Sequence, residues 1–118
     1  MRSSVGVEWI VDAHGCAPAD LRSIRRLRAV FRAAIAHHDL HPIGPGVWHR
    51  FRGARGVTGV QMLSESHLAC HTYPERAYAA FSLFSCRPAA AWNWARALRR
   101  SLGATRVTVR RVRRGRSR

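Results

Sequence analysis

The chain has 118 residues and a mass of 13.3 kDa, which is the size of one domain and too short for two ordinary ones. A hydrophobic fraction of 47% supports a buried core and excludes wholesale disorder, and no apolar run approaches the ~20 residues that span a bilayer. The formal charge of +15 is typical of nucleic-acid-binding proteins. However, every basic residue is arginine, a bias that a GC-rich genome also produces, so charge alone does not identify a partner.

The cysteines and the two ends of the chain bear on its location. Three cysteines are an odd, sparse set, which argues against a disulfide-stapled secreted domain. The first residues lead into Glu8 and Asp12, and not into the apolar core of a signal peptide. We therefore expect a cytoplasmic protein. Residues 113–118 are mostly arginine, and we expect them to form a frayed basic tail.

The first half of the chain predicts a strand, a helix and a pair of strands. Residues 6–13 alternate apolar and polar side chains, which is typical of a strand with one buried face. Apolar residues then recur at helical spacing across 18–39. Prolines and glycines in 42–46 end that helix, and 47–51 and 57–63 predict two strands around a turn.

The second half predicts further strands and one more helix. Residues 66–73 read as a strand, whereas 77–86 are ambiguous because their apolar residues alternate while their alanines permit a helix. Residues 88–102 predict a helix that ends at Gly103, and 104–112 alternate as a last strand. This order of elements predicts an α+β fold, an antiparallel sheet covered by helices on one face.

Some polar residues have structural explanations. The histidines within 37–41 lie at a helix C-terminus, where the dipole favours imidazolium, and we expect no metal site there. Cys70, within a predicted strand, is expected to be a small buried hydrophobe. Thr72 and Glu75 have the spacing of a capping box, so a helix cap competes with any active-site role for Glu75.

A concentration of polar residues in 56–75 lies between two apolar strands, and packing does not explain it. It contains Glu65-Ser66-His67-Leu68 and His71-Thr72-Tyr73-Pro74-Glu75. With Gly56-Val57-Thr58-Gly59, Phe84-Ser85-Cys86, Gly15-Cys16 and Leu102-Gly103-Ala104, these motifs resemble the prokaryotic S-adenosylmethionine decarboxylase proenzymes. The resemblance covers nearly the whole chain.

The resemblance implies the α/β sandwich of that family and a chain that cuts itself into residues 1–65 and 66–118. In such a reaction Ser66 Oγ attacks the carbonyl carbon of Glu65 and converts the amide into an ester. Thr58, at a position that is usually serine, assists this step, and His71 removes the Ser66 α-proton. The cofactor implied is a pyruvoyl group generated from Ser66.

The resemblance also assigns the chemistry of the cleaved chain. The pyruvoyl carbonyl forms a Schiff base with the substrate amine and accepts the electrons released with carbon dioxide. Cys86 matches the proton donor of the family, which favours a strand for 77–86.

The substrate-binding residues follow in the same way. Glu75 matches the acidic residue that binds the ribose hydroxyls, and Leu68 matches a position whose backbone meets adenine. Tyr73 stands where the family has tryptophan. Phe51 is the nearest candidate for the phenylalanine that stacks on adenine, although the stretch before Gly56 is one residue longer than in the family.

The function implied is decarboxylation of S-adenosylmethionine to supply the aminopropyl donor for spermidine, by a homodimer of cleaved protomers. No membrane and no specific nucleic acid is expected as a partner. Two alternatives stay open. A pyruvoyl-dependent decarboxylase of L-ornithine or L-arginine would retain Ser66, His71 and Cys86 and lose adenine recognition. A non-catalytic, arginine-rich nucleic-acid-binding homologue would have no reason to cut itself.

Overall fold

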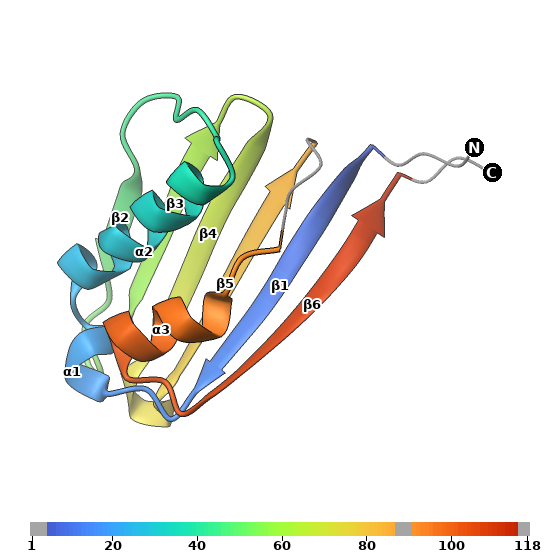
Figure 1. Cartoon of the computed structure of the whole chain (residues 1–118). Coiled ribbons are helices and arrows are strands. Elements are labelled where there is room, and N and C mark those ends of the chain that lie inside the picture. The colour runs from blue at the N-terminus through green and yellow to red at the C-terminus, as the bar shows by residue number, and fades with distance from the viewer. Residues whose placement is uncertain (1–4, 87–90, 116–118) are drawn as a thin grey trace.

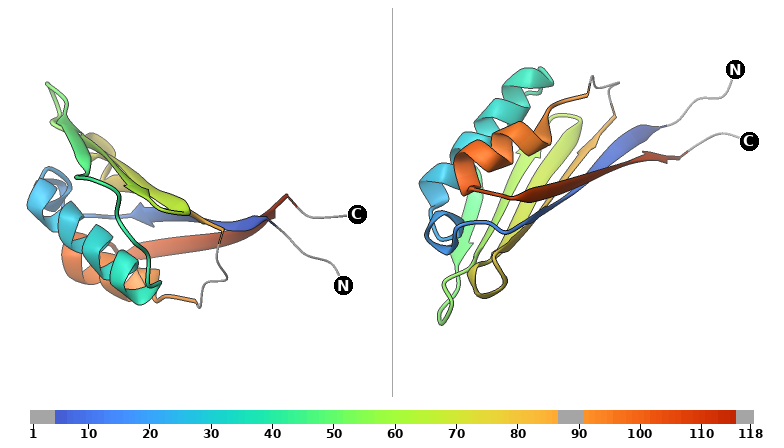
Figure 2. Two further views of the ribbon diagram at one scale, coloured as in Figure 1. Left: turned by 90° about the horizontal axis from the view of Figure 1, so that it is seen from above. Right: turned by 60° about the horizontal axis from the view of Figure 1, so that its bottom comes forward.

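The computed structural model describes residues 5–86 and 91–115. Its elements are β1 (Gly6–His14), α1 (Pro18–Leu21), α2 (Ile24–His37), β2 (Val47–Arg50), β3 (Val57–Leu63), β4 (Ser66–Tyr73), the 3-10 helix η1 (Pro74–Arg76), β5 (Tyr78–Ser85), α3 (Trp94–Leu102) and β6 (Arg106–Arg114). The strands form one antiparallel six-stranded sheet in the order β2-β3-β4-β5-β1-β6. The helices lie on one side of this sheet (Figures 1 and 2), so the predicted α+β architecture is confirmed.

The core lies between the sheet and the helices because the strands alternate as their sequences predict. Along β1, Val7, Trp9 and Val11 are buried, whereas the residues between them are only partly buried. Leucine, valine and phenylalanine side chains of α2 and the Trp94 and Leu98 side chains of α3 are buried against them. Each fully buried large apolar side chain contributes about 1.5–3 kcal/mol of hydrophobic stabilisation.

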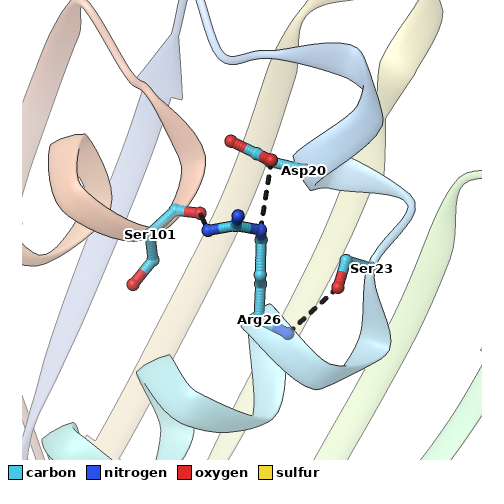
Figure 3. A network of polar contacts seen from close by, with 4 residues as sticks. All are labelled: Asp20, Ser23, Arg26 and Ser101. Atoms are coloured by element: carbon cyan, nitrogen blue, oxygen red, sulfur yellow. Dashed lines mark hydrogen bonds and ion pairs between the residues drawn. The ribbon is translucent and has the colours of Figure 1, made fainter.

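The helix predicted over 18–39 is in fact two helices. Ser23 breaks it, because its backbone is extended and its side chain accepts a hydrogen bond from the Arg26 N–H as the cap of α2. Arg26 also pairs with Asp20 of α1 at 3.1 Å and donates to the Ser101 carbonyl of α3 at 3.3 Å (Figure 3). These contacts join the three helices at the place where a single helix would have run straight on.

The helix predicted over 88–102 begins at Trp94, with Asn93 capping the Arg96 N–H. Residues 88–90 of that prediction lie outside the described residues. Gly103 ends the helix in the left-handed conformation, with φ of 68°, as predicted. The ambiguous segment 77–86 holds strand β5, paired with β4 and β1.

The last strand extends further than its sequence predicts. Arg113 and Arg114 pair with Val7 and Gly6 of β1, and Arg114 also forms an ion pair with Glu8 at 2.9 Å. The prediction of a frayed tail is therefore wrong for these two arginines. A main-chain ladder holds them regardless of their polar side chains, and residues 116–118 lie outside the described residues.

The other side of the sheet carries no helix among the described residues, and we call it the open face. Alternation places Thr58, His71 and Tyr73 on it, since their neighbours on β3 and β4 are buried beneath the helices. Val60 and Met62, also on this face, are 42% and 58% exposed. Within the described residues, no helix has the length and apolar character needed to cross a membrane.

Candidate functional site

The bond between Glu65 and Ser66 lies where a tight hairpin enters a strand. Leu63 and Ser66 are the last paired residues of β3 and β4, so Ser64 and Glu65 alone form the turn. The turn is anchored because the Ser64 N–H donates to the His41 carbonyl at 2.9 Å. The predicted cleavage site therefore follows an anchored turn at the end of the sheet.

Two features of this junction bear on the predicted attack of Ser66 on the Glu65 carbonyl. The Ser66 hydroxyl oxygen is buried and has no hydrogen-bond partner among the described residues. The Glu65 carbonyl accepts a hydrogen bond from the Cys86 N–H at 3.1 Å. A buried hydroxyl without a partner costs about 1–3 kcal/mol, and a fixed N–H donor stabilises negative charge that develops on a carbonyl oxygen. The carbonyl next to the unpartnered hydroxyl is thus already polarised.

Cys86 reaches this junction because Ser66 pairs with Ser85 across β4 and β5. Cys86 is exposed, whereas Cys16 and Cys70 are buried. Burial raises the pKa of Cys70 to about 12 and, together with the charge of Asp20, that of Cys16 to about 11. Cys70 is fully buried, which confirms its prediction as a core residue, and Cys86 is the accessible thiol.

A second group of polar residues lies at the opposite end of β4. Thr58 and His71 are directly opposed in the ladder of β3 and β4, and Thr58 Oγ1 lies 2.9 Å from His71 Nδ1. His49 of β2 pairs with Thr58 on the other side, and its ring lies 4.6 Å from that of Phe51. Phe51 is 51% exposed and is the first residue after β2, where the connection to β3 begins. Hydroxyl, imidazole and an accessible aromatic ring therefore share one end of the sheet.

Glu75 lies next to this group, on η1. The capping-box interpretation is wrong, because η1 begins after Tyr73 without a side-chain cap. The Thr72 hydroxyl instead accepts from the Val57 N–H at 2.9 Å and donates to the Leu21 carbonyl at 2.8 Å, which joins the sheet to α1. The exposed Glu75 and Tyr73 line a pocket of about 440 Å³ together with Arg76, Tyr78 and Ala80.

These two groups do not meet within one chain. Ser66 and His71 are five residues apart on β4, which at about 3.3 Å per residue separates them by about 16 Å. An odd spacing also places their side chains on opposite faces, Ser66 towards the helices and His71 on the open face. Leu68, between them, has its side chain in the core, and its backbone lies between Gln61 of β3 and Leu83 of β5.

The sequence model for S-adenosylmethionine decarboxylase matches residues 7–115, which is nearly the whole described chain. The chain belongs to the S-adenosylmethionine decarboxylase family. The S-adenosylmethionine decarboxylase proenzyme of Carboxydothermus hydrogenoformans is 32% identical over 116 residues, which cover 96% of this chain and 88% of that protein. The proenzyme of Thermococcus kodakarensis is 32% identical over 83 residues, 70% of this chain and 57% of its own length.

The fold of the family is also present in a solved structure. The crystal structure of the adenosylmethionine decarboxylase from Aquifex aeolicus superposes with a TM-score of 0.75. It covers 96% of this chain and 92% of that one at 21% identity. This chain therefore shares that fold over 96% of its length, whereas it spans little more than half of the Thermococcus relatives.

The sequence of this family member gives no motif for Tyr78, which lines the Glu75 pocket, or for Asp12, its hydrogen-bond partner. The Tyr78 hydroxyl donates a hydrogen bond to Asp12 Oδ1, although 66 positions separate the two residues in the chain. The Tyr78 ring also stacks on that of Tyr73. The only signal in the sequence was the place of Asp12 on the polar side of the first strand, which shows the face it occupies but not its partner.

Proposed function

We propose that this chain is a proenzyme that cleaves itself between Glu65 and Ser66 into residues 1–65 and 66–118, and then decarboxylates S-adenosylmethionine. The product is an aminopropyl donor for spermidine synthesis. The observation that carries the proposal is the buried, unpartnered Ser66 hydroxyl beside a carbonyl that the Cys86 N–H polarises. Family membership and the match over residues 7–115 support it.

Cleavage begins when Ser66 Oγ attacks the carbonyl carbon of Glu65. The Cys86 N–H stabilises the oxyanion that forms, and collapse of this intermediate breaks the C–N bond and leaves Glu65 esterified to Ser66 with a free amine. A base then removes the Ser66 α-proton, so that the Glu65 carboxylate leaves and dehydroalanine remains. Addition of water and loss of ammonia give the pyruvoyl group at residue 66.

The pyruvoyl group supplies an electron sink for decarboxylation of an amine-bearing substrate. The chain's own residues must then return a proton to the substrate α-carbon. We propose the thiol of the exposed Cys86 as this donor, because the Cys86 backbone N–H already contacts the Glu65 carbonyl at the processing site. The buried Cys16 and Cys70 cannot act there, because burial raises the pKa of each and keeps both thiols away from solvent.

The separation of Ser66 from His71 leads us to propose a homodimer in which each centre is composite. Proton removal needs the base within about 3 Å, whereas these residues lie about 16 Å apart along β4. In a two-fold dimer each chain would contribute Ser66 and Cys86 to one centre and Thr58 and His71 to the other. The open face, with exposed Val60 and Met62, is the surface that supports such pairing.

The pocket at η1 is the proposed nucleoside half of the substrate site. The exposed Glu75 carboxylate can accept hydrogen bonds from the two ribose hydroxyls, and Tyr73 offers a ring face to the heterocycle. Phe51, at the same end of the sheet, is a second ring that can stack on adenine. Leu68 contributes through its backbone only.

A denaturing mass spectrum and a carbon dioxide assay test the proposal. The purified wild-type protein should give the fragments 1–65 and 66–118, whereas Ser66→Ala should give one intact chain. Ser64→Ala, in the same turn, is the matched control and should still be cleaved. Cleaved protein should release labelled carbon dioxide from carboxyl-labelled S-adenosylmethionine and not from L-ornithine or L-arginine. An intact wild-type chain, or turnover of the plain amino acids alone, would contradict it.

A further inference from the structure

Three strands bring acidic and aromatic side chains together on the open face beside the Glu75 pocket. Asp12 and His14 lie on β1, Tyr73 ends β4 and Tyr78 begins β5. The Tyr78 hydroxyl donates to Asp12 Oδ1. The Tyr78 ring stacks on Tyr73 with centroids 5.7 Å apart and planes at 20°, and it lies 5.1 Å from the His14 ring. Tyr78 is thus the central member, with neighbours on both sides.

The Tyr78 hydroxyl is a permanent hydrogen-bond donor in this arrangement. Burial, followed by the hydrogen bond and charge of Asp12, raises the pKa of Tyr78 to about 12. A phenol with a raised pKa stays protonated at neutral pH, so the Tyr78 hydroxyl donates this hydrogen bond. The bond fixes where the Tyr78 ring lies, because it holds the hydroxyl end of the ring at Asp12, while the Tyr73 and His14 rings pack against the ring itself.

Tyr73 depends on that ring. It is 40% exposed, and its ring packs on Tyr78 at one face. Tyr73 and Tyr78 are also directly paired across β4 and β5, at the point where η1 turns the chain and presents Glu75. Both tyrosines and Glu75 line the same pocket of about 440 Å³. A change in the Tyr78 ring therefore moves the wall against which a ligand at Glu75 must rest.

We propose that Asp12 and Tyr78 are positioning residues that hold the Tyr73 ring at the angle needed to stack on the heterocycle of a nucleoside whose ribose binds Glu75. This inference rests on the proposed function and adds two residues to it. Neither residue touches the reacting atoms. Their loss should weaken nucleoside binding and leave self-cleavage and the chemical step intact.

Four variants test the pair. Tyr78→Phe keeps the ring and removes the hydroxyl, and Asp12→Ala removes the acceptor. Because either change breaks the same bond, each should raise the KM for S-adenosylmethionine and the Kd for adenosine about three- to tenfold. The double variant should be no weaker than either single one, since the second change has nothing left to remove. Asp12→Asn, whose amide oxygen can accept the same bond, should stay within about twofold of wild type.

The readouts separate positioning from a loss of folding. Adenosine affinity by isothermal titration, KM, kcat, the extent of cleavage and Tm are measured on cleaved protein. We expect complete cleavage and an unchanged kcat in all four variants. Ser82→Ala, on the open face of the same strand and outside the pocket, is the control and should change nothing. An unchanged KM and Kd in Tyr78→Phe, or additive losses in the double variant, would overturn the inference.

The same measurements distinguish this inference from the proposed function. Wild-type protein that decarboxylates S-adenosylmethionine, with variants that bind adenosine equally well, would overturn the positioning role alone. Wild-type protein that binds adenosine, with the expected losses in the variants but no carbon dioxide release, would support the positioning role and contradict the proposed reaction. Wild-type protein that neither binds adenosine nor turns over would overturn both.

Discussion

Replacing His71 tests whether the processing site is built from two chains. If His71 removes the Ser66 α-proton, His71→Ala protein should form the ester and stop there, because the base acts only after the amide has become an ester. Hydroxylamine, which cleaves esters, should then split the stalled chain at residue 65. His67→Ala is the matched control, since His67 lies on the same open face and nearer to Ser66, with its ring stacked on Phe84.

The geometry predicts how much self-cleavage and activity should return when the Ser66→Ala and His71→Ala chains form mixed dimers. Ser66 and His71 of one chain are about 16 Å apart, about five times the reach of a proton transfer, so the base must come from a second copy. In a dimer of one Ser66→Ala chain and one His71→Ala chain, one centre has both functional residues and the other has neither. Random pairing of equal amounts makes about half of the dimers mixed, so about half of the His71→Ala chains should be cleaved and about a quarter of the wild-type centres should form.

Co-expression of the two variants with different tags measures both fractions. Intact-mass analysis of each tagged chain gives the cleaved fraction, and carbon dioxide release gives the active centres. If the His71→Ala chain stays uncut in purified mixed dimers, the composite centre is wrong. Complete self-cleavage of His71→Ala protein alone, with a stalled ester in His67→Ala protein, would transfer the role of base to His67.

Three further predictions concern single residues. Cys86→Ala keeps the backbone N–H at Glu65, so it should still cleave itself while decarboxylation falls steeply, whereas Cys86→Pro lacks that N–H and should cleave about 10²–10³-fold more slowly in a time course by mass spectrometry. Iodoacetamide at pH 8 should modify Cys86 first, because the raised pKa values of Cys70 and Cys16 keep those thiols protonated until the pH approaches about 12 and about 11; peptide mapping that finds either of them modified first would contradict this. Ala77 has φ of 50°, which disfavours any residue with a Cβ, so Ala77→Gly should stabilise the protein by up to about 1 kcal/mol and raise Tm by a few degrees, and a lower Tm would refute the strain.

Local pattern was sufficient for most of the architecture, and the resemblance of a contiguous motif directed attention to the hairpin at Ser66. Alternation along residues 6–13 and 66–73 shows which side chains face the core, because successive residues on a strand must point to opposite faces. The motif around Ser66 is contiguous in the chain, so the sequence alone identifies it. Once 66–73 is predicted to be an extended strand, the five-residue spacing also predicts that Ser66 and His71 lie far apart in one chain.

Tertiary contacts decided what local pattern left open. Residues 77–86 could be a helix or a strand by their own composition, and their pairing with both β4 and β1 makes them a strand. The apolar period across 18–39 predicts a continuous helix, yet Arg26 reaches both Asp20 and a carbonyl of α3, and these non-local contacts accompany the break at Ser23.

The Asp12–Tyr78 hydrogen bond is the clearest case of a feature that the sequence does not contain. Its two residues are 66 positions apart, on strands that become neighbours only when β5 inserts between β4 and β1. Neither residue has a motif around it, since a phenol and a carboxylate need only proximity to pair. Sheet order is a global property, set by how the strands pair with one another and pack against the helices, and it alone brings Asp12 to Tyr78, which lines the pocket at Glu75.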